Sequence, residues 1–176
     1  KAEEFDLEKG VEFLCGKSGD HVIDTLTLYS GLITLETLSS TEDSKNCMIK
    51  ILEWGRDNFG LTYTNGMIKR WAYISHISFT TDIPLMVELS SPLRNLGTKL
   101  TQAVEDLFGE GMAFETSNVS VGHDPLKRKN GVAPFSIQHR ANFQFGDNKY
   151  FSEAPVPTAL HIKLLEELEA DVRRMK

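Results

Sequence analysis

The sequence contains few of the features that identify whole classes of proteins. Its 176 residues include only two cysteines, Cys15 and Cys47, and neither lies in a CxxC or Cys/His spacing. This scarcity excludes a disulfide-rich scaffold and a local zinc motif, and it is typical of reduced thiols in a cytoplasmic protein. No apolar run approaches the roughly 20 residues of a membrane-spanning helix. The acidic opening, KAEEFDLEK, differs from a signal or transit peptide. We therefore expect a soluble, cytoplasmic protein without a membrane segment.

Basic residues are also scarce. Lysine and arginine together number 19, against 25 aspartates and glutamates, so the formal net charge is -6 at pH 7. An acidic surface of this kind repels a phosphate backbone, and we do not expect nucleic acid as a partner.

Motifs for nucleotides and metals are incomplete. The segment Gly10–Ser18, GVEFLCGKS, resembles a phosphate-binding loop, but five residues separate its glycines where that loop has four. A strand pattern follows it, where the phosphate would need a helix N-terminus. The five histidines show no HxH, HxxxH or HExxH spacing. We therefore expect no cofactor and no metal.

What the sequence does contain is material for an ordinary globular fold. Apolar residues make up 40% and charged residues 25%. A chain of this length buries roughly 70% of the surface that it exposes when unfolded. We expect a single α+β domain over residues 1–176, with residues 1–19 as a poorly ordered or edge-strand lead-in.

The N-terminal half alternates strand patterns with one helix. Residues 21–38 read as two β-branched strands joined at Ser30-Gly31. A helix follows, between a serine or threonine cap near residue 40 and Gly60. The turn dipeptide Asn65-Gly66 then predicts a second hairpin.

The longest strand pattern, WAYISHISF at residues 71–79, is the centre of this expected fold. Alternation places Trp71, Tyr73, Ile77 and Phe79 on one face. We expect this face to be the floor beneath the helix that starts at Leu93. The opposite face carries Ala72, Ile74, His76 and Ser78. If helices lie on one side of the sheet only, a second subunit, a partner or a ligand must cover this face.

The C-terminal half adds two amphipathic helices. Ser91-Pro92 ends a short helix, and a longer one follows with the stripe Leu93, Leu96, Leu100, Val104 and Leu107, stopped by Gly109. Strands are expected in MAFETSNVSV and APFSIQHRANF. Tyr150-Phe151 is expected to follow a turn and to insert its apolar side chains into the core. The last helix, residues 157–175, is expected to bury Leu160, Leu164, Leu168 and Val172.

Together these elements predict an α+β fold with one antiparallel sheet of about six strands built from hairpins. About three helices pack mainly on one face, in the order ββα-ββα-ββα.

The leading functional hypothesis is a non-enzymatic, cytoplasmic protein-interaction module that associates with itself through its sheet, or with another protein. Six residues are the candidate contacts: Ile74, His76 and Ser78 on the strand, and Lys127, Arg128 and Lys129 in a basic loop. The alternative is a hydrolytic or phosphate-handling enzyme that uses His123, Asp124 and His139 beside that loop.

Overall fold

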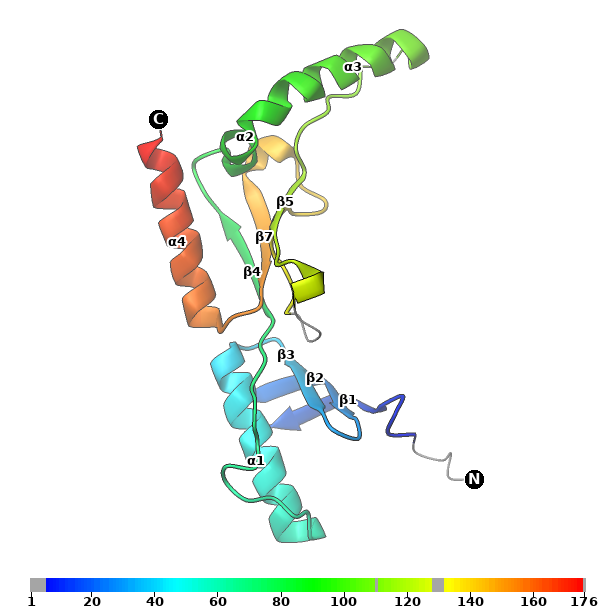
Figure 1. Ribbon diagram of the computed structural model, residues 1–176, viewed down its shortest axis with the longest axis vertical. Helices are drawn as coiled ribbons and strands as arrows, with labels where there is room; N and C mark the ends of the chain where they lie inside the picture. The colour runs from blue at the N-terminus through cyan, green and yellow to red at the C-terminus, as the bar shows by residue number, and fades with distance from the viewer. Residues whose placement is uncertain (1–5, 110, 128–131, 176) are drawn as a thin grey trace. The chain divides into compact units, whose positions relative to one another are not determined.

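The computed structural model describes residues 6–109, 111–127 and 132–175. Its contacts divide the chain into two compact units, Lys1–Trp71 (unit 1) and Ala72–Lys176 (unit 2), which are coloured blue to cyan-green and green to red in Figure 1. Each unit combines an antiparallel sheet with helices, so the predicted α+β class is confirmed.

Unit 1 contains a three-stranded antiparallel sheet in the order β1-β2-β3. The predicted hairpin around Ser30-Gly31 is present, as strands β2 and β3. The expected lead-in contains an edge strand, β1, which pairs with β2 through Gly16 and Lys17; Gly16 pairs with Ile23. The strands are β1 (Val11–Ser18), β2 (His21–Leu28) and β3 (Ile33–Thr37).

Helix α1, Thr41–Phe59, begins and ends where the sequence predicts. The Ser40 side chain accepts a hydrogen bond from the Asp43 backbone N–H at 3.1 Å, which satisfies a free donor of the first turn. Gly60 ends the helix with a φ of 69°, a left-handed conformation that glycine adopts without steric cost. The helix buries Met48 and Leu52 together with Tyr63, and the half-buried residues around them are Leu26, Leu35, Ile68 and Trp71.

The predicted second hairpin does not form. Residues 60–74 are irregular, and strand β4 begins only at Ser75. Trp71, which we expected on that strand, instead packs in the core of unit 1.

Unit 2 contains a four-stranded antiparallel sheet in the order β4-β7-β6-β5. The fold is therefore built on two sheets of three and four strands rather than on one sheet of six. The expected plug at Tyr150-Phe151 is part of an inner strand that we did not predict, β7. The strands are β4 (Ser75–Thr80), β5 (Asn118–Val121), β6 (Phe135–His139) and β7 (Lys149–Ala154).

One face of this sheet carries the core of unit 2. Ile77 pairs with Ser152 and Phe79 with Tyr150, so these four side chains share a face. Helices α2 (Leu85–Leu89) and α4 (Thr158–Arg174) contribute to the same core. Its buried apolar residues are Ile83, Leu85, Met86, Ile137, Tyr150, Leu165 and Val172.

Two helix predictions need correction here. The apolar face of β4 packs against α4 and α2, and not against the helix that starts after Leu93. That helix, α3 (Arg94–Phe108), has no buried residue. In α4 the buried side chains are His161, Leu165 and Val172, whereas Leu160 and Leu164 are exposed. The prediction is therefore confirmed for Val172 and for Leu168, which packs against the core, and wrong for Leu160 and Leu164, whose expected places are taken by His161 and Leu165. The described part of the chain thus holds four α-helices in place of about three, and the repeated ββα order is not observed.

None of the described helices has the length and apolar character to cross a membrane.

His161 connects α4 to the sheet. It is 0% exposed, and its Nδ1 and Nε2 lie 2.8 Å from the hydroxyl oxygens of Ser75 and Ser152, respectively. The Ser152 hydroxyl donates its only proton to the Ser136 carbonyl, so it accepts from Nε2–H of the imidazole. Since burial disfavours a second ring proton, Nδ1 accepts from the Ser75 hydroxyl at 2.8 Å, and the Ala154 carbonyl, 3.3 Å from the same hydroxyl, is its longer alternative acceptor. The ring is neutral in this arrangement, and burial, aided by the charge of His76, lowers the pKa of His161.

We expect unit 2 to lose stability between about pH 7 and pH 5. Because the folded-state pKa of His161 is lowered, the unfolded chain takes up the proton first as the pH falls below about 6.5. The opening free energy of the β7 amides, measured by hydrogen exchange, should then fall by at most about 1.4 kcal/mol per pH unit per histidine. Half-buried His139, whose pKa is also lowered by burial, contributes in the same direction.

The variant His161→Gln should reduce this slope at β7, while the β2 amides of unit 1 serve as an internal control. An unchanged slope in the variant would show that His161 is not the group that titrates.

Candidate protein-interaction surface

Helix α3 displays an apolar row that the described structure leaves open. Leu93, just before the helix, and Leu96, Leu100 and Leu107 within it are 51%, 53%, 41% and 76% exposed. Their spacing of three, four and seven residues places them on one side of the helix. We refer to these four residues as the leucine row. Side chains of this kind in an amphipathic helix are normally buried, and contiguous exposed apolar patches mark interaction sites.

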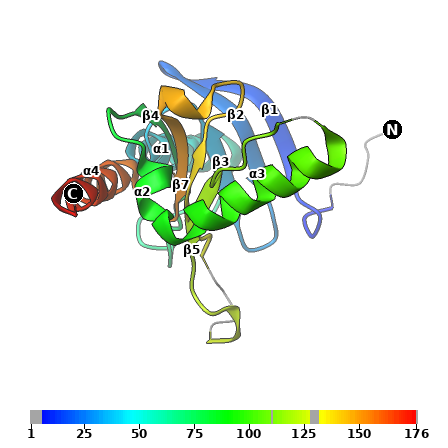
Figure 2. The ribbon, with the colours of Figure 1, turned by 90° about the horizontal axis from the view of Figure 1, so that it is seen from above.

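The position of α3 explains why the leucine row is not covered. Figure 1 shows the helix projecting from the end of the unit 2 sheet, and Figure 2 shows it extending from α2 past β5. Ser91-Pro92 separates it from α2 through a short 3₁₀ turn, Ser91–Leu93, and Gly109 ends it with a φ of 71°. The predicted break and stop are both confirmed.

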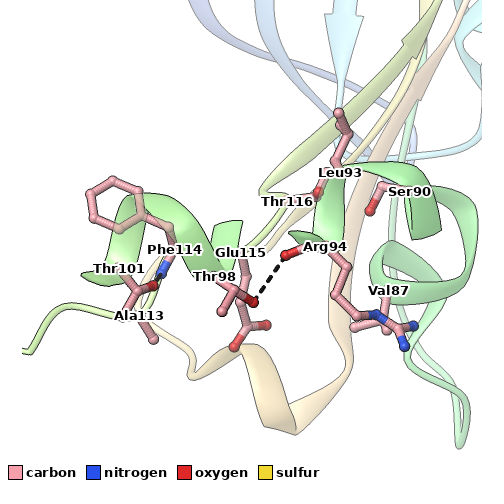
Figure 3. Close-up of a pocket in the computed structure, with 10 residues that line it drawn as sticks. All are labelled: Val87, Ser90, Leu93, Arg94, Thr98, Thr101, Ala113, Phe114, Glu115 and Thr116. Atoms are coloured by element: carbon pink, nitrogen blue, oxygen red, sulfur yellow. Dashed lines mark hydrogen bonds between the residues drawn. The ribbon is translucent and has the colours of Figure 1, made fainter. Parts of the chain in front are cut away.

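One side of α3 is covered by residues 113–116, which run alongside it. The Phe114 backbone N–H donates to the Thr101 hydroxyl at 3.0 Å (Figure 3). That hydroxyl in turn donates to the Gly97 carbonyl. A Cβ atom on Gly97 would lie only 2.4 Å from the Phe114 carbonyl oxygen. Only glycine therefore permits this close approach, and the contact holds α3 in place relative to β5.

A groove of about 400 Å³ lies between α3 and residues 113–116. Its walls mix apolar side chains, such as Leu93 and Phe114, with Thr98 and the charged groups of Arg94 and Glu115 (Figure 3). Neither charged group forms an ion pair with another described residue. The groove is continuous with the leucine row through Leu93, so the two features form one surface.

The structure does not bring the predicted acid-base residues together. His123 follows the end of β5 at which Val121 pairs with Phe135, whereas His139 ends β6 at the other end of the same hairpin. A four-residue strand separates these ends by roughly 13 Å. His123 Nε2 accepts from the Val132 backbone N–H at 3.1 Å, which holds it in its loop.

The neighbouring groups have structural partners as well. Asp124 accepts from the Leu126 backbone N–H at 3.0 Å, as in a typical turn. His139 stacks on Phe145 with 4.0 Å between ring centroids, its Nδ1 is buried without a hydrogen-bond partner, and burial lowers its pKa. Among the residues that the structure covers, no three His, Cys, Asp or Glu side chains are grouped to hold a metal ion.

The candidate contact residues of β4 lie on one exposed face. His76 Nε2 is 3.0 Å from a Glu153 carboxylate oxygen, Ile74 is exposed just before the strand, and Ser78 is exposed within it. On this face the His76 imidazole and the Glu153 carboxylate are already hydrogen-bonded to each other. Lys127 is exposed at the end of the 3₁₀ helix Pro125–Lys127, whereas Arg128 and Lys129 lie outside the described residues.

Sequence reasoning identified the leucine row but assigned it to the core, and it missed Gly97. A glycine inside an otherwise strong helix pattern is the feature that could have revealed a closely packed neighbour.

We expect Gly97→Ala to detach residues 113–116 from α3. In an ordinary helix this change would stabilise by about 1 kcal/mol. Here the clash with the Phe114 carbonyl should lower the opening free energy of the Phe114 amide by about 1–3 kcal/mol, measured by hydrogen exchange. Gly146→Ala is the control, because a Cβ atom at that position meets open space. Increased protection of Phe114 in the Gly97 variant would contradict the described contact.

Comparisons of the chain with protein-family models, curated proteins and solved structures give no match.

Proposed function

We propose that this protein is a non-enzymatic, cytoplasmic interaction module that binds an amphipathic helix of another protein chain along the leucine row of α3. The exposure of the leucine row carries this proposal. Because Leu93, Leu100 and Leu107 recur every seven residues with Leu96 between them, the row has the a and d spacing of a two-helix contact. A partner helix with the same spacing can insert its apolar side chains between these leucines.

The energetic reason is the cost of leaving such a row in water. Full burial of a leucine is worth about 1.5–3 kcal/mol, and the members of the row, which are 41% to 76% exposed, retain a corresponding share of that gain for a partner. The polar face of β4, where association was expected from the sequence, has its His76 and Glu153 side chains already paired and offers a smaller gain. We therefore place the interaction on α3 and not on the sheet.

No specific observation favours the enzymatic alternative. A hydrolytic or phosphate-handling site needs an acid and a base that act on one substrate within hydrogen-bond reach. His123 and Asp124 are at one end of the β5–β6 hairpin and His139 is at the other.

We expect Leu100→Lys to weaken binding of a helical probe. The probe is a fluorescein-labelled synthetic peptide of four heptads with leucine at each a and d position and alternating lysine and glutamate elsewhere. A charge at the centre of the leucine row would have to be desolvated, so affinity measured by fluorescence anisotropy should fall at least about tenfold.

The matched control is Leu160→Lys, which places the same charge at an equally exposed leucine of α4 (43% against 41% for Leu100). This control should bind the peptide as the unmodified chain does. Equal losses in both variants, or no binding by the unmodified chain, would refute the proposal.

A further inference from the structure

The charges beside the leucine row identify which helix fits it. When Leu93, Leu100 and Leu107 occupy the a positions, Lys99 and Asp106 both occupy g positions. They lie seven residues apart, so they flank the same edge of the row, one toward each end of α3. Both are exposed. Lys99 forms no ion pair with a described residue, and Asp106 accepts only a hydrogen bond from the Gln102 side chain of its own helix.

The geometry points to α3 of a second copy of this chain, in antiparallel orientation, as the partner helix; this inference rests on the function proposed above. In an antiparallel pair, the g edge of one helix lies against the g edge of the other. Two-fold symmetry then places Lys99 of each copy beside Asp106 of the other, which gives two ion pairs. A parallel pair would place g positions against e positions, which hold the uncharged Gly97 and Val104.

The order of charges along α3 supports the same orientation. The helix dipole favours acidic residues in the first turn and basic residues in the last. Helix α3 has neither: Arg94 is at its start, and Glu105 and Asp106 are in its last turn. This order is unfavourable in an isolated helix. It becomes favourable beside an antiparallel copy, because the basic start of each helix then lies next to the acidic end of the other.

The apolar layers of such a pair are also complementary. In the register that aligns the charges, Leu96 of one copy packs against Leu107 of the other. Leu100 packs against the small Ala103, so a large side chain meets a small one at the centre. The flank of α3 at the e edge of the row, opposite the g edge, is already covered by the contact of Gly97 and Thr101 with Phe114. A single open side restricts the assembly to a closed dimer.

Charge reversal tests the partner and its orientation in the full-length chain. We expect Lys99→Glu alone, and Asp106→Lys alone, each to weaken the dimer at least tenfold in sedimentation-equilibrium measurements, since each creates two like-charge contacts. An equimolar mixture of the two single variants should dimerise. The introduced carboxylate of one chain then meets the introduced ammonium of the other, and the second contact keeps its original Asp106 and Lys99. The double variant should recover the dimer as well, because both of its ion pairs are restored with their charges exchanged.

The control is Lys50→Glu, which makes the same charge change on an exposed position of α1 and should leave the dimer unchanged. A chain that remains monomeric throughout would overturn the inference, whereas binding of the synthetic helix would still uphold the proposed function. A dimer that ignores the single reversals, or that the mixture fails to restore, would likewise overturn the antiparallel pairing of α3.

Discussion

Unit 2 depends on the burial of one neutral imidazole between two serine hydroxyls. His161 lies on α4, Ser75 on β4 and Ser152 on β7, so the two short hydrogen bonds fix a helix to the sheet at a single register. Ser152 passes the interaction on to β6 through the Ser136 carbonyl. Any rotation of α4 that buried Leu164 instead would break both hydrogen bonds to His161, and the loss of a buried hydrogen-bond partner costs about 1–3 kcal/mol.

The placement of α4 determines what happens to α3. One face of a four-stranded sheet is already covered by α4 and the short α2, whose Leu85 and Met86 are almost completely buried. These two helices occupy the core face of the unit 2 sheet, and α3 is instead held along its Gly97 and Thr101 side, with the leucine row exposed. The leucine row is thus exposed because α4 and α2 already fill the core of unit 2. A helix with leucines on one side and a neighbour on the other is suited to receive a second helix.

Local features of the sequence predicted the ends of elements well, because the physics that sets them is local. Ser40 and Gly60 act through their own side chain and backbone, and the break at Ser91-Pro92 follows from a missing N–H. Strand β7 was missed because its buried side chains include Ser152 and Ala154, which carry almost no hydrophobic pattern. The face of α4 was misassigned because the buried position is a histidine whose value depends on residues 86 and 9 positions away.

The α3 site shows the limit of such predictions most clearly. A row of leucines shows that one side of a helix avoids water, but it does not show which surface covers that side. Core packing and helix pairing between chains bury the same residues, so periodicity alone cannot separate them. The charges that flank the row can separate these two cases. A helix buried against its own sheet gains nothing from Arg94 at its start and Asp106 at its end, whereas a helix that meets its own copy in reverse does. Charge order along an amphipathic helix therefore carries information about its partner that the apolar pattern lacks.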